Sequence, residues 1–495
     1  MSVHRQFHLV VLVVIVVASA FLPSMAQDRP EPPFDCFALV AGKGATADGS
    51  VITAHNEDVN APAVNLYKVP ARTHAPGEQI TLRKGGTVQQ AASTLGSLWI
   101  NVPGWDVCDS YINEHGVAIS SDGCPSREDK PELVEGGIVF WLRRIVADRA
   151  LTAREGVRIA TGLIDRFGYA SSGRSYVIAD RNEAWILAVV NGKHWVAQRV
   201  PDDMVVLIPN CFTIQEVDLK DTANFLGSPD IVEYAMQRGW YDPARDGAFN
   251  FAKAYSNPHS LDHPGNIYRH WSAIRRVSGI DLDPRKQLPF AVRPKHKLTV
   301  LDAVAVMRDH FEETPRDSSG NGTAGDPHTL NDPTVCAGGT RYCFVAQLRS
   351  GLPEAIAPIV WIAFHIPDVQ GFSAWYPSVT STPAILRTGD DAAGLAWHLD
   401  TAFVLEKTVV PAGFKRYVAL TERVRKHFTR NYPVARKAWR VFESDQFRSQ
   451  RAFETRLLTS AGQNGMVPVD LISRRCAEEA AKVYEKAGAI LRQLR

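Results

Sequence analysis

Three side chains suited to nucleophilic chemistry lie close together near the start of the chain: Cys36, His55 and Asp58. A thiol becomes a strong nucleophile once a neighbouring base takes its proton, and a carboxylate can hold and orient that base. The segment 36–58 alternates on either side of a turn rich in Gly, Ala and Asp, which predicts a β-hairpin. Local folding alone would therefore bring the three groups together.

We expect the two strands of this hairpin at 36–41 and 51–56. Pairing them outward from the turn places Cys36 opposite Asn56, so that the histidine and the aspartate flank the thiol. The alternative interpretation is an ordinary buried strand cysteine, because free Cys is among the most buried residue types.

The residues before Cys36 indicate proteolytic processing. Residues 1–26 have the form of a secretory signal peptide, with a basic start, an apolar run and small residues at the end. The apolar run is too short to favour a membrane-spanning helix, so no stable membrane anchor is expected. Residues 27–35 are polar and rich in proline, and we expect them to be a propeptide. The expected product is a secreted or periplasmic protein whose mature chain begins at Cys36.

An N-terminal Cys36 needs no separate histidine as its base. A free α-amine has a pKa of about 8 and a thiol of about 8.5, so the two exchange a proton at neutral pH. Asp58 is expected to hold the resulting ammonium. A protonated His55 beside the thiol would lower the pKa of Cys36. Because strand neighbours alternate, its ring can equally point to the other face of the sheet.

Several sequence blocks, taken in order, resemble a known family. These blocks are Cys36, 42–43, Ala45, 48–50, 56–58, 113–120, 169–173, 178–180, 183–187, 192–195, 199–203 leading to Asn210, 308–312 and 345–349. Together they resemble the C69 (formerly U34) dipeptidase family, cysteine hydrolases of the N-terminal-nucleophile superfamily, and the match extends to about Pro383. The resemblance implies an α+β fold in the form of a four-layer αββα sandwich, and a dipeptide as the substrate.

Further site residues follow from this resemblance. Asn210 comes after an expected strand, and the relatives use an asparagine in a similar place to stabilise the oxyanion. The alternative role for Asn210 is that of a turn residue. The acylase relatives take an active-site arginine from a later segment; Arg269 is the candidate, and Arg275, Arg276 or a solvated arginine are the alternatives. Relatives often carry arginine at the position of His55, so the role of that position is open.

The remaining elements fit the same fold class. Two helical segments, at 136–150 and 152–167, lie between two groups of expected strands, which is an α+β arrangement. From about residue 389 the chain changes to helices with interspersed basic and acidic residues. We therefore expect a hydrolase domain over 36–388 and a helical C-terminal extension over 389–495.

Composition limits the partners and cofactors. With 55 Lys and Arg against 53 Asp and Glu, no field of one sign favours nucleic acid. Seven cysteines allow Cys36 to stay free while the other six form up to three disulfides. Cys108 with Cys124 and Cys336 with Cys343 are plausible pairs, and buried free thiols are the alternative. The sequence has no CxxC pair and no HExxH motif, so no metal or other cofactor is expected, and a homo-oligomer remains open.

These inferences predict a secreted cysteine dipeptidase with Cys36 as its nucleophile. An acylase of non-peptide amides, similar to penicillin V acylase, is the alternative among hydrolases. An inactive secreted binding protein on the same fold is the alternative from another class. A papain-like protease fits poorly, because it needs a cysteine on a helix and Cys36 opens a strand.

Overall fold

The computed structural model describes residues 36–105, 107–319, 325–329, 333–399, 409–461 and 467–494, and the chain from Phe34 onward forms one compact unit. The signal peptide and propeptide expected at 1–26 and 27–35 lie outside the described residues. Within the described ranges, no helix combines the length and the apolar character needed to cross a membrane.

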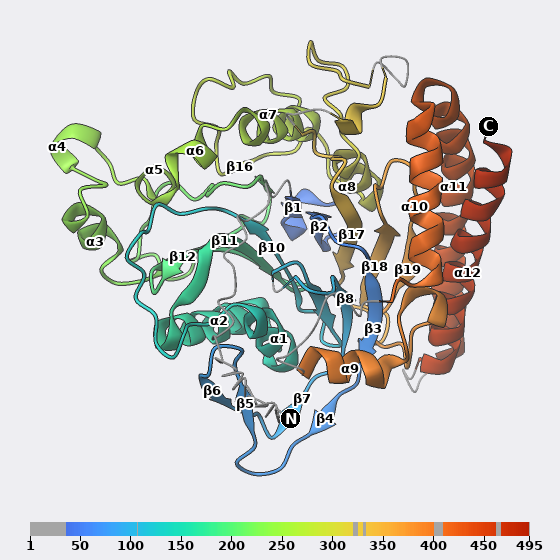
Figure 1. Cartoon of the computed structure of the whole chain (residues 1–495), viewed down its shortest axis with the longest axis horizontal. Coiled ribbons are helices and arrows are strands. Elements are labelled where there is room, and N and C mark those ends of the chain that lie inside the picture. The colour runs from blue at the N-terminus through green and yellow to red at the C-terminus, as the bar shows by residue number, and fades with distance from the viewer. Residues whose placement is uncertain are drawn as a thin grey trace, which may run out of the picture. The chain divides into compact units, whose positions relative to one another are not determined.

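Two antiparallel sheets form the centre of this unit (Figure 1). The first sheet has the order β16 (Ala291–Val292), β14 (Val205–Ile208), β1 (Phe37–Ala41), β2 (Val51–Asp58), β17 (Thr340–Leu348), β18 (Pro358–Phe364) and β19 (Ser373–Trp375). The second has the order β15 (Phe225–Gly227), β13 (Trp195–Arg199), β12 (Ala184–Gly192), β11 (Tyr169–Ala179), β10 (Ala118–Gly123), β9 (Ser110–Asn113), β8 (Ser97–Asn101) and β3 (Asn65–Val69). Short strands pair beside them: β4 (Arg72–Thr73) with β7 (Ser93–Thr94), and β5 (Gln79–Thr81) with β6 (Thr87–Gln89).

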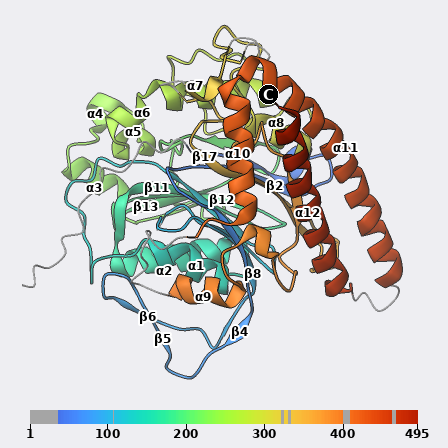
Figure 2. The same cartoon turned by 45° about the vertical axis from the view of Figure 1, so that its right-hand side comes forward.

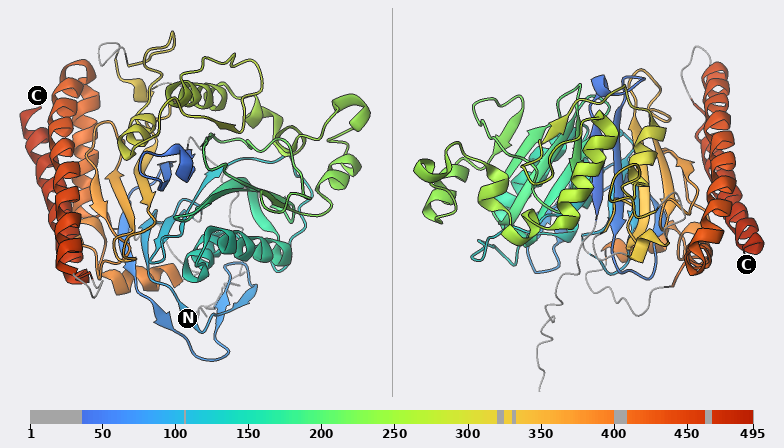
Figure 3. Two further views of the ribbon diagram at one scale, coloured as in Figure 1. Left: turned by 180° about the vertical axis from the view of Figure 1, so that it is seen from behind. Right: turned by 90° about the horizontal axis from the view of Figure 1, so that it is seen from above.

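Helices cover the outer face of each sheet. α1 (Phe140–Arg149) and α2 (Ala153–Phe167) pack against strands of the second sheet, and α7 (Pro264–Ser278) and α8 (Val300–Met307) pack against strands of the first. The two sheets meet where β1 contacts β10 and β2 contacts β11. Figure 3 shows these layers from behind and from above. The expected α+β fold with an αββα sandwich is confirmed.

The sequence explains locally why α2 forms. The hydroxyl of Thr152 accepts a hydrogen bond from the N–H of Glu155 at 3.2 Å and caps the helix. Val157 and Ile164 are fully buried on its inner face, and burying each contributes about 1.5–3 kcal/mol to stability. Gly168 ends the helix at a φ of 77°, a conformation that favours glycine.

Short helices connect the second sheet to α7: α3 (Ile231–Gln237), α4 (Pro243–Asp246), α5 (Phe251–Tyr255) and α6 (Pro258–Leu261). The C-terminal segment is helical, as expected: α9 (Asp391–Leu399), α10 (Ala412–Lys426), α11 (Phe428–Ala461) and α12 (Val469–Gln493). Figure 2 shows α10, α11 and α12 side by side. Trp439 of α11 donates from Nε1 to the carbonyl of Val369 at 2.9 Å, which ties this segment to the chain between β18 and β19.

All seven cysteines are buried and free. The plausible pairs Cys108 with Cys124 and Cys336 with Cys343 do not form disulfides, and the alternative of buried free thiols is the one found. The Sγ of Cys124 lies 3.7 Å from a backbone carbonyl, and that of Cys336 lies 4.0 Å from Nε2 of His328. The thiols of Cys124 and Cys336 thus lie against other groups and not against the cysteines with which they were paired.

Candidate active site

The predicted hairpin is present as β1 and β2, the neighbouring central strands of the first sheet. Its register differs by one residue from the expected one, because Phe37 and not Cys36 pairs with Asn56. Cys36 therefore lies opposite Glu57. In a sheet with period two, a slip of one residue changes which side chain faces the thiol.

The turn of the hairpin accounts for this register. It contains a short 3₁₀ helix, Lys43–Ala45, and the N–H of Gly44 donates to the carbonyl of Asp202 at 2.6 Å. Gly42 packs so closely on the same segment that a Cβ would lie 2.5 Å from the carbonyl oxygens of Pro201 and Asp202. A contact distant in sequence thus fixes the turn.

Cys36 is fully buried directly before β1. Its Sγ lies 3.5 Å from Oε1 of Glu57 and accepts a hydrogen bond from the N–H of Asp58 at 3.4 Å. Burial raises the pKa of the thiol well above its usual value, and the carboxylates of Glu57, Asp58 and Asp122 raise it further. The thiol is therefore protonated in the full-length chain, and a nucleophilic Cys36 requires a base.

His55 points to the same face of β2 as Glu57, toward the second sheet. Its Nε2 lies 3.0 Å from Oε2 of Glu57, and its Nδ1 lies 3.6 Å from Oδ1 of Asp122. Burial lowers the pKa of His55, but the carboxylates of Asp122 and Glu57 outweigh this effect and the pKa is raised. Donor atoms of Cys36, His55 and Glu57 all lie within 4.8 Å of one another. Such a trio is also a possible set of metal ligands, but hydrogen bonds through Glu57 already link its members.

Asp58 is the last residue of β2 and is buried. Its backbone contacts the Cys36 thiol through both the N–H and the carbonyl oxygen, the latter at 3.7 Å. Its carboxylate acts electrostatically on Cys36 and on Arg341. The structure thus places Asp58 beside Cys36, and its role toward the α-amine stays a prediction.

The sequence reasoning assigned no role to Glu57 and did not identify Asp122. Burial raises the pKa of Asp122 to about 7, against the lowering effect of His55. Asp122 lies on β10, two residues beyond the block 113–120, and a carboxylate on an expected buried strand was the available signal. Glu57, His55 and Asp122 form one buried network beside the thiol.

Arg269 links two residues that are far apart in sequence, Cys36 and Asn210. Arg269 of α7 donates from Nη1 to the carbonyl of Cys36 at 3.0 Å and from Nη2 to Oδ1 of Asn210 at 2.9 Å. This contact fixes the orientation of the Asn210 amide, because only its oxygen can accept from a guanidinium. The Nδ2 of Asn210 is buried, and no described residue accepts a hydrogen bond from it.

The other arginines of α7 have different surroundings. Arg276 pairs with Asp309 and Glu312, at 2.6 and 2.7 Å. Arg269 is the candidate that donates a hydrogen bond to Cys36. Asn266, one turn earlier in α7, was missed as a site residue; its Oδ1 accepts from Arg269 at 2.7 Å. Its i−3 spacing from Arg269 on a helix was the available signal.

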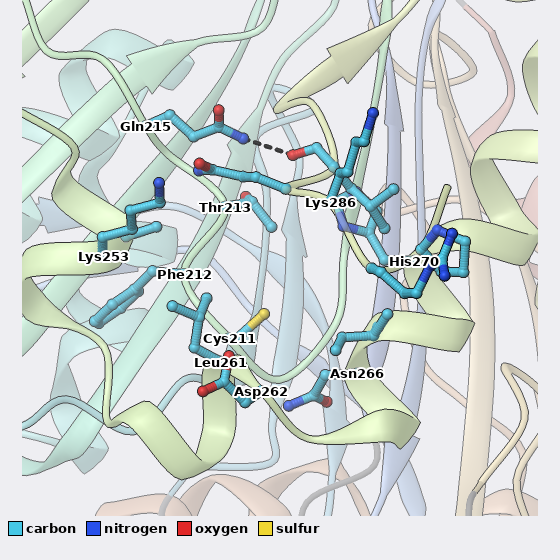
Figure 4. A pocket seen from close by; sticks show the side chains of 16 residues that line it. Cys211, Phe212, Thr213, Gln215, Lys253, Leu261, Asp262, Asn266, His270 and Lys286 are labelled. Carbon is cyan, nitrogen blue, oxygen red and sulfur yellow. Dashed lines mark hydrogen bonds between the residues drawn. The ribbon is translucent and has the colours of Figure 1, made fainter. Parts of the chain in front are cut away.

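A cavity of about 260 Å³ lies next to this cluster (Figure 4). Asn266 belongs both to its wall and to the Arg269 network. Cys211, which follows Asn210, and His270 also line it, and exposed Lys253 and Lys286 give it basic walls. Its wall thus combines apolar side chains with polar and charged ones, and concave sites with convergent polar groups are where enzymes usually bind ligands.

The sequence of this chain is similar to a known family of peptidases. A sequence model described as "Peptidase family C69" matches residues 111–430. A probable dipeptidase from Latilactobacillus sakei is 27% identical over 365 residues, covering 71% of this chain and 76% of that protein. A dipeptidase from Bifidobacterium longum is 29% identical over 395 residues, covering 71% of this chain and 73% of that protein.

Solved structures also match. Penicillin V acylase from Agrobacterium tumefaciens is 14% identical, with a TM-score of 0.32, over 69% of this chain and 85% of that chain. A conjugated bile acid hydrolase from Clostridium perfringens is 11% identical, with a TM-score of 0.32. The match covers 69% of this chain and 92% of that chain.

Proposed function

Because this chain belongs to peptidase family C69, we propose that it is a cysteine dipeptidase whose nucleophile is Cys36. In this proposal, export and removal of residues 1–35 turn an inactive precursor into an enzyme that begins at Cys36. The observation that carries the proposal is that Arg269 binds both the carbonyl of Cys36 and the side chain of Asn210, whose amide N–H has no acceptor among the described residues.

Processing supplies the base that the buried thiol lacks. Cutting before Cys36 converts its backbone amide into a free α-amine, with an ordinary pKa of about 8. This amine takes the thiol proton, and Asp58, already beside Cys36, holds the ammonium. The carboxylates around the thiol disfavour a thiolate in the precursor, which suits an inactive form.

The catalytic cycle then uses groups already in position. The thiolate attacks the carbonyl carbon of the peptide bond, and the Nδ2 of Asn210 donates to the oxyanion that forms. The ammonium gives its proton to the leaving amine as the C–N bond breaks, which leaves an acyl-enzyme. Water then attacks the thioester and gives its proton to the α-amine, and the thiol is released.

Arg269 is a positioning residue in this scheme. Its guanidinium holds the carbonyl of Cys36 and the oxygen of Asn210 at the same time, so the nucleophile and the oxyanion donor keep a fixed spacing. His55, with Glu57 and Asp122, provides a buried charged wall on the other side of the thiol. We propose that this wall orients Cys36 and does not act as the base.

Activity profiling tests this function. The secreted protein is assayed on a panel of dipeptides and of acyl amides, together with Cys36→Ala and, as a matched control, Cys476→Ala, which removes another buried thiol in α12. We expect hydrolysis of dipeptides, its complete loss in Cys36→Ala and its retention in Cys476→Ala. Preferential cleavage of acyl amides would favour the acylase alternative, and equal activity of Cys36→Ala would refute the nucleophile.

A further inference from the structure

Four side chains that can bind metal ions lie together far from Cys36 in the sequence: His310, His328, Cys336 and Asp368. All four are buried, and one donor atom from each lies within 4.8 Å of the other three. They come from the chain between α8 and β19. The mechanism above uses none of them.

The distances among the donor atoms of His310, His328 and Asp368 are close to those of a tetrahedral metal site. Nε2 of His310 lies 3.2 Å from Nε2 of His328, and Oδ2 of Asp368 lies 3.6 and 3.3 Å from these two atoms. The Sγ of Cys336 lies 4.0 Å from Nε2 of His328. Zinc bonds of about 2.0–2.3 Å in tetrahedral geometry place ligand atoms about 3.3–3.6 Å apart. A small contraction would seat an ion among them.

Each imidazole is oriented from behind by a carboxylate. Nδ1 of His310 lies 3.2 Å from Oε1 of Glu312, and Nδ1 of His328 lies 2.7 Å from Oδ1 of Asp326. A carboxylate partner favours a proton on Nδ1, and in the neutral ring this leaves Nε2 as the atom that can bind a metal. This arrangement of histidine and carboxylate is typical of metal ligands and their supporting partners.

Two imidazole nitrogens and a carboxylate that face one another in a buried space favour a positive charge between them, which a metal ion or a proton on one imidazole can supply. Neither oxygen of Asp368 has a well-formed hydrogen-bond partner among the described residues. The nearby Arg308 makes two hydrogen bonds to the carboxylate of Glu443, at 2.6 and 3.1 Å. Arg425 pairs with Asp326, at 2.7 Å. Both arginines thus form their hydrogen bonds to carboxylates with Glu443 and Asp326, and Arg308 acts on Asp368 only through its charge.

We propose that His310, His328, Cys336 and Asp368 bind one Zn²⁺ ion as a structural site. One thiolate, one carboxylate and two neutral imidazoles balance the charge of a divalent ion, so the buried centre is neutral. A thiolate with two imidazoles selects zinc over calcium or magnesium, which prefer oxygen. Four protein ligands leave no open position for substrate, so the site is structural and not catalytic.

The site connects the catalytic strand to the C-terminal helices. The Nδ2 of Asn56, in β2 between His55 and Glu57, donates to the carbonyls of Met307 and Val335 at 2.9 and 2.8 Å. Val335 directly precedes the ligand Cys336. On the other side, Asp326, which orients His328, pairs with Arg425 of α10. An ion here would fix the two segments that hold Asn56.

Metal analysis of the full chain tests the proposal. Protein purified without a chelator and without a polyhistidine tag is analysed by plasma mass spectrometry, and we expect about one zinc per chain. The chelated protein is then titrated with Co²⁺, whose tetrahedral thiolate complexes have intense charge-transfer bands. Absence of zinc together with absence of such a band on Co²⁺ addition would overturn the site.

Variants locate the ion. Cys336→Ser should lose the charge-transfer band, and Cys476→Ser, which removes an equally buried thiol, should keep it. Cys36→Ala should also keep it, because the trio Cys36, His55 and Glu57 is a separate cluster. Loss of the band in Cys36→Ala and not in Cys336→Ser would place the ion at the active site and refute the proposal. If Cys336→Ser does not fold, the Co²⁺ titrations of wild type and Cys36→Ala still decide.

Discussion

Replacing Asn210 with aspartate separates the donor role of its amide from its structural role. Asn210 accepts from Arg269 through Oδ1 at 2.9 Å, and its Nδ2 has no acceptor among the described residues. The side chain introduced by Asn210→Asp would have the same shape and would keep the bond to Arg269 as an ion pair. Only the free N–H donor is lost, and an oxygen takes its place.

The size of the effect follows from that loss. Removing one oxyanion-hole donor costs about 2.7–4 kcal/mol of transition-state stabilisation, a fall in kcat of about 10²–10³. Because the new oxygen also repels the oxyanion, we expect the fall in kcat of Asn210→Asp to lie at or beyond the upper end of this range. The unfolding temperature should not fall, since the contact with Arg269 becomes charge-assisted.

Asn266→Asp is the matched comparison. The Nδ2 of Asn266 donates to the carbonyls of Ser260 and Asn210 at 2.7 and 3.1 Å, so this amide is used in the fold. We expect a lower unfolding temperature for Asn266→Asp and a smaller loss of kcat than for Asn210→Asp. The assay is dipeptide hydrolysis by protein whose processing has been checked by mass. A folded, processed Asn210→Asp with kcat within about threefold of wild type would refute the oxyanion role.

Two further predictions concern stability. The pKa of Asp122 is raised from an unfolded value of about 3.9 to about 7, so the folded state holds the extra proton in this range and stability falls as pH rises through it. Asp122→Asn should flatten this dependence in urea unfolding between pH 4 and 7, and an unchanged slope would contradict the assignment. Gly42→Ala would place a Cβ 2.5 Å from the carbonyl of Asp202, so we expect it to destabilise the fold by about 1–3 kcal/mol. Gly162→Ala, in α2 with open space around it, should stabilise by about 0.5–1 kcal/mol, and equal thermal shifts for the two would count against the tight packing of the hairpin turn.

Local sequence patterns predicted which strands and helices form better than they predicted the register in which the strands pair. The hairpin follows from residues 36–58 alone, and α2 follows from its apolar spacing and its cap at Thr152. The register of the hairpin could not be predicted in this way, because the contact between Gly44 and Asp202 fixes the turn and no local pattern in the sequence indicates that contact. The disulfide pairs failed for a related reason: proximity in sequence does not determine where a thiol points.

In the candidate active site, too, the residues close in sequence were predicted and most contacts between distant segments were not. The proximity of Asp58 and His55 to Cys36 comes from one hairpin and was predicted. Asn210 and Arg269 were reached through family resemblance, and only the fold shows that they contact each other. Asp122 comes from the opposite sheet, so no spacing in the sequence could place it beside His55. The ligands of the proposed zinc site are likewise spread over 310–368, outside any short metal-binding motif.

The measurement that tests the mechanism most directly is the identity of the first residue of the purified active protein, by intact mass and N-terminal sequencing. We predict a chain that begins at Cys36, with activity that appears together with this cut. An active protein that begins at Gln27 would have no α-amine on Cys36. The N-terminal-nucleophile mechanism would then be wrong, and His55, within 4.8 Å of the thiol, would be the base to examine.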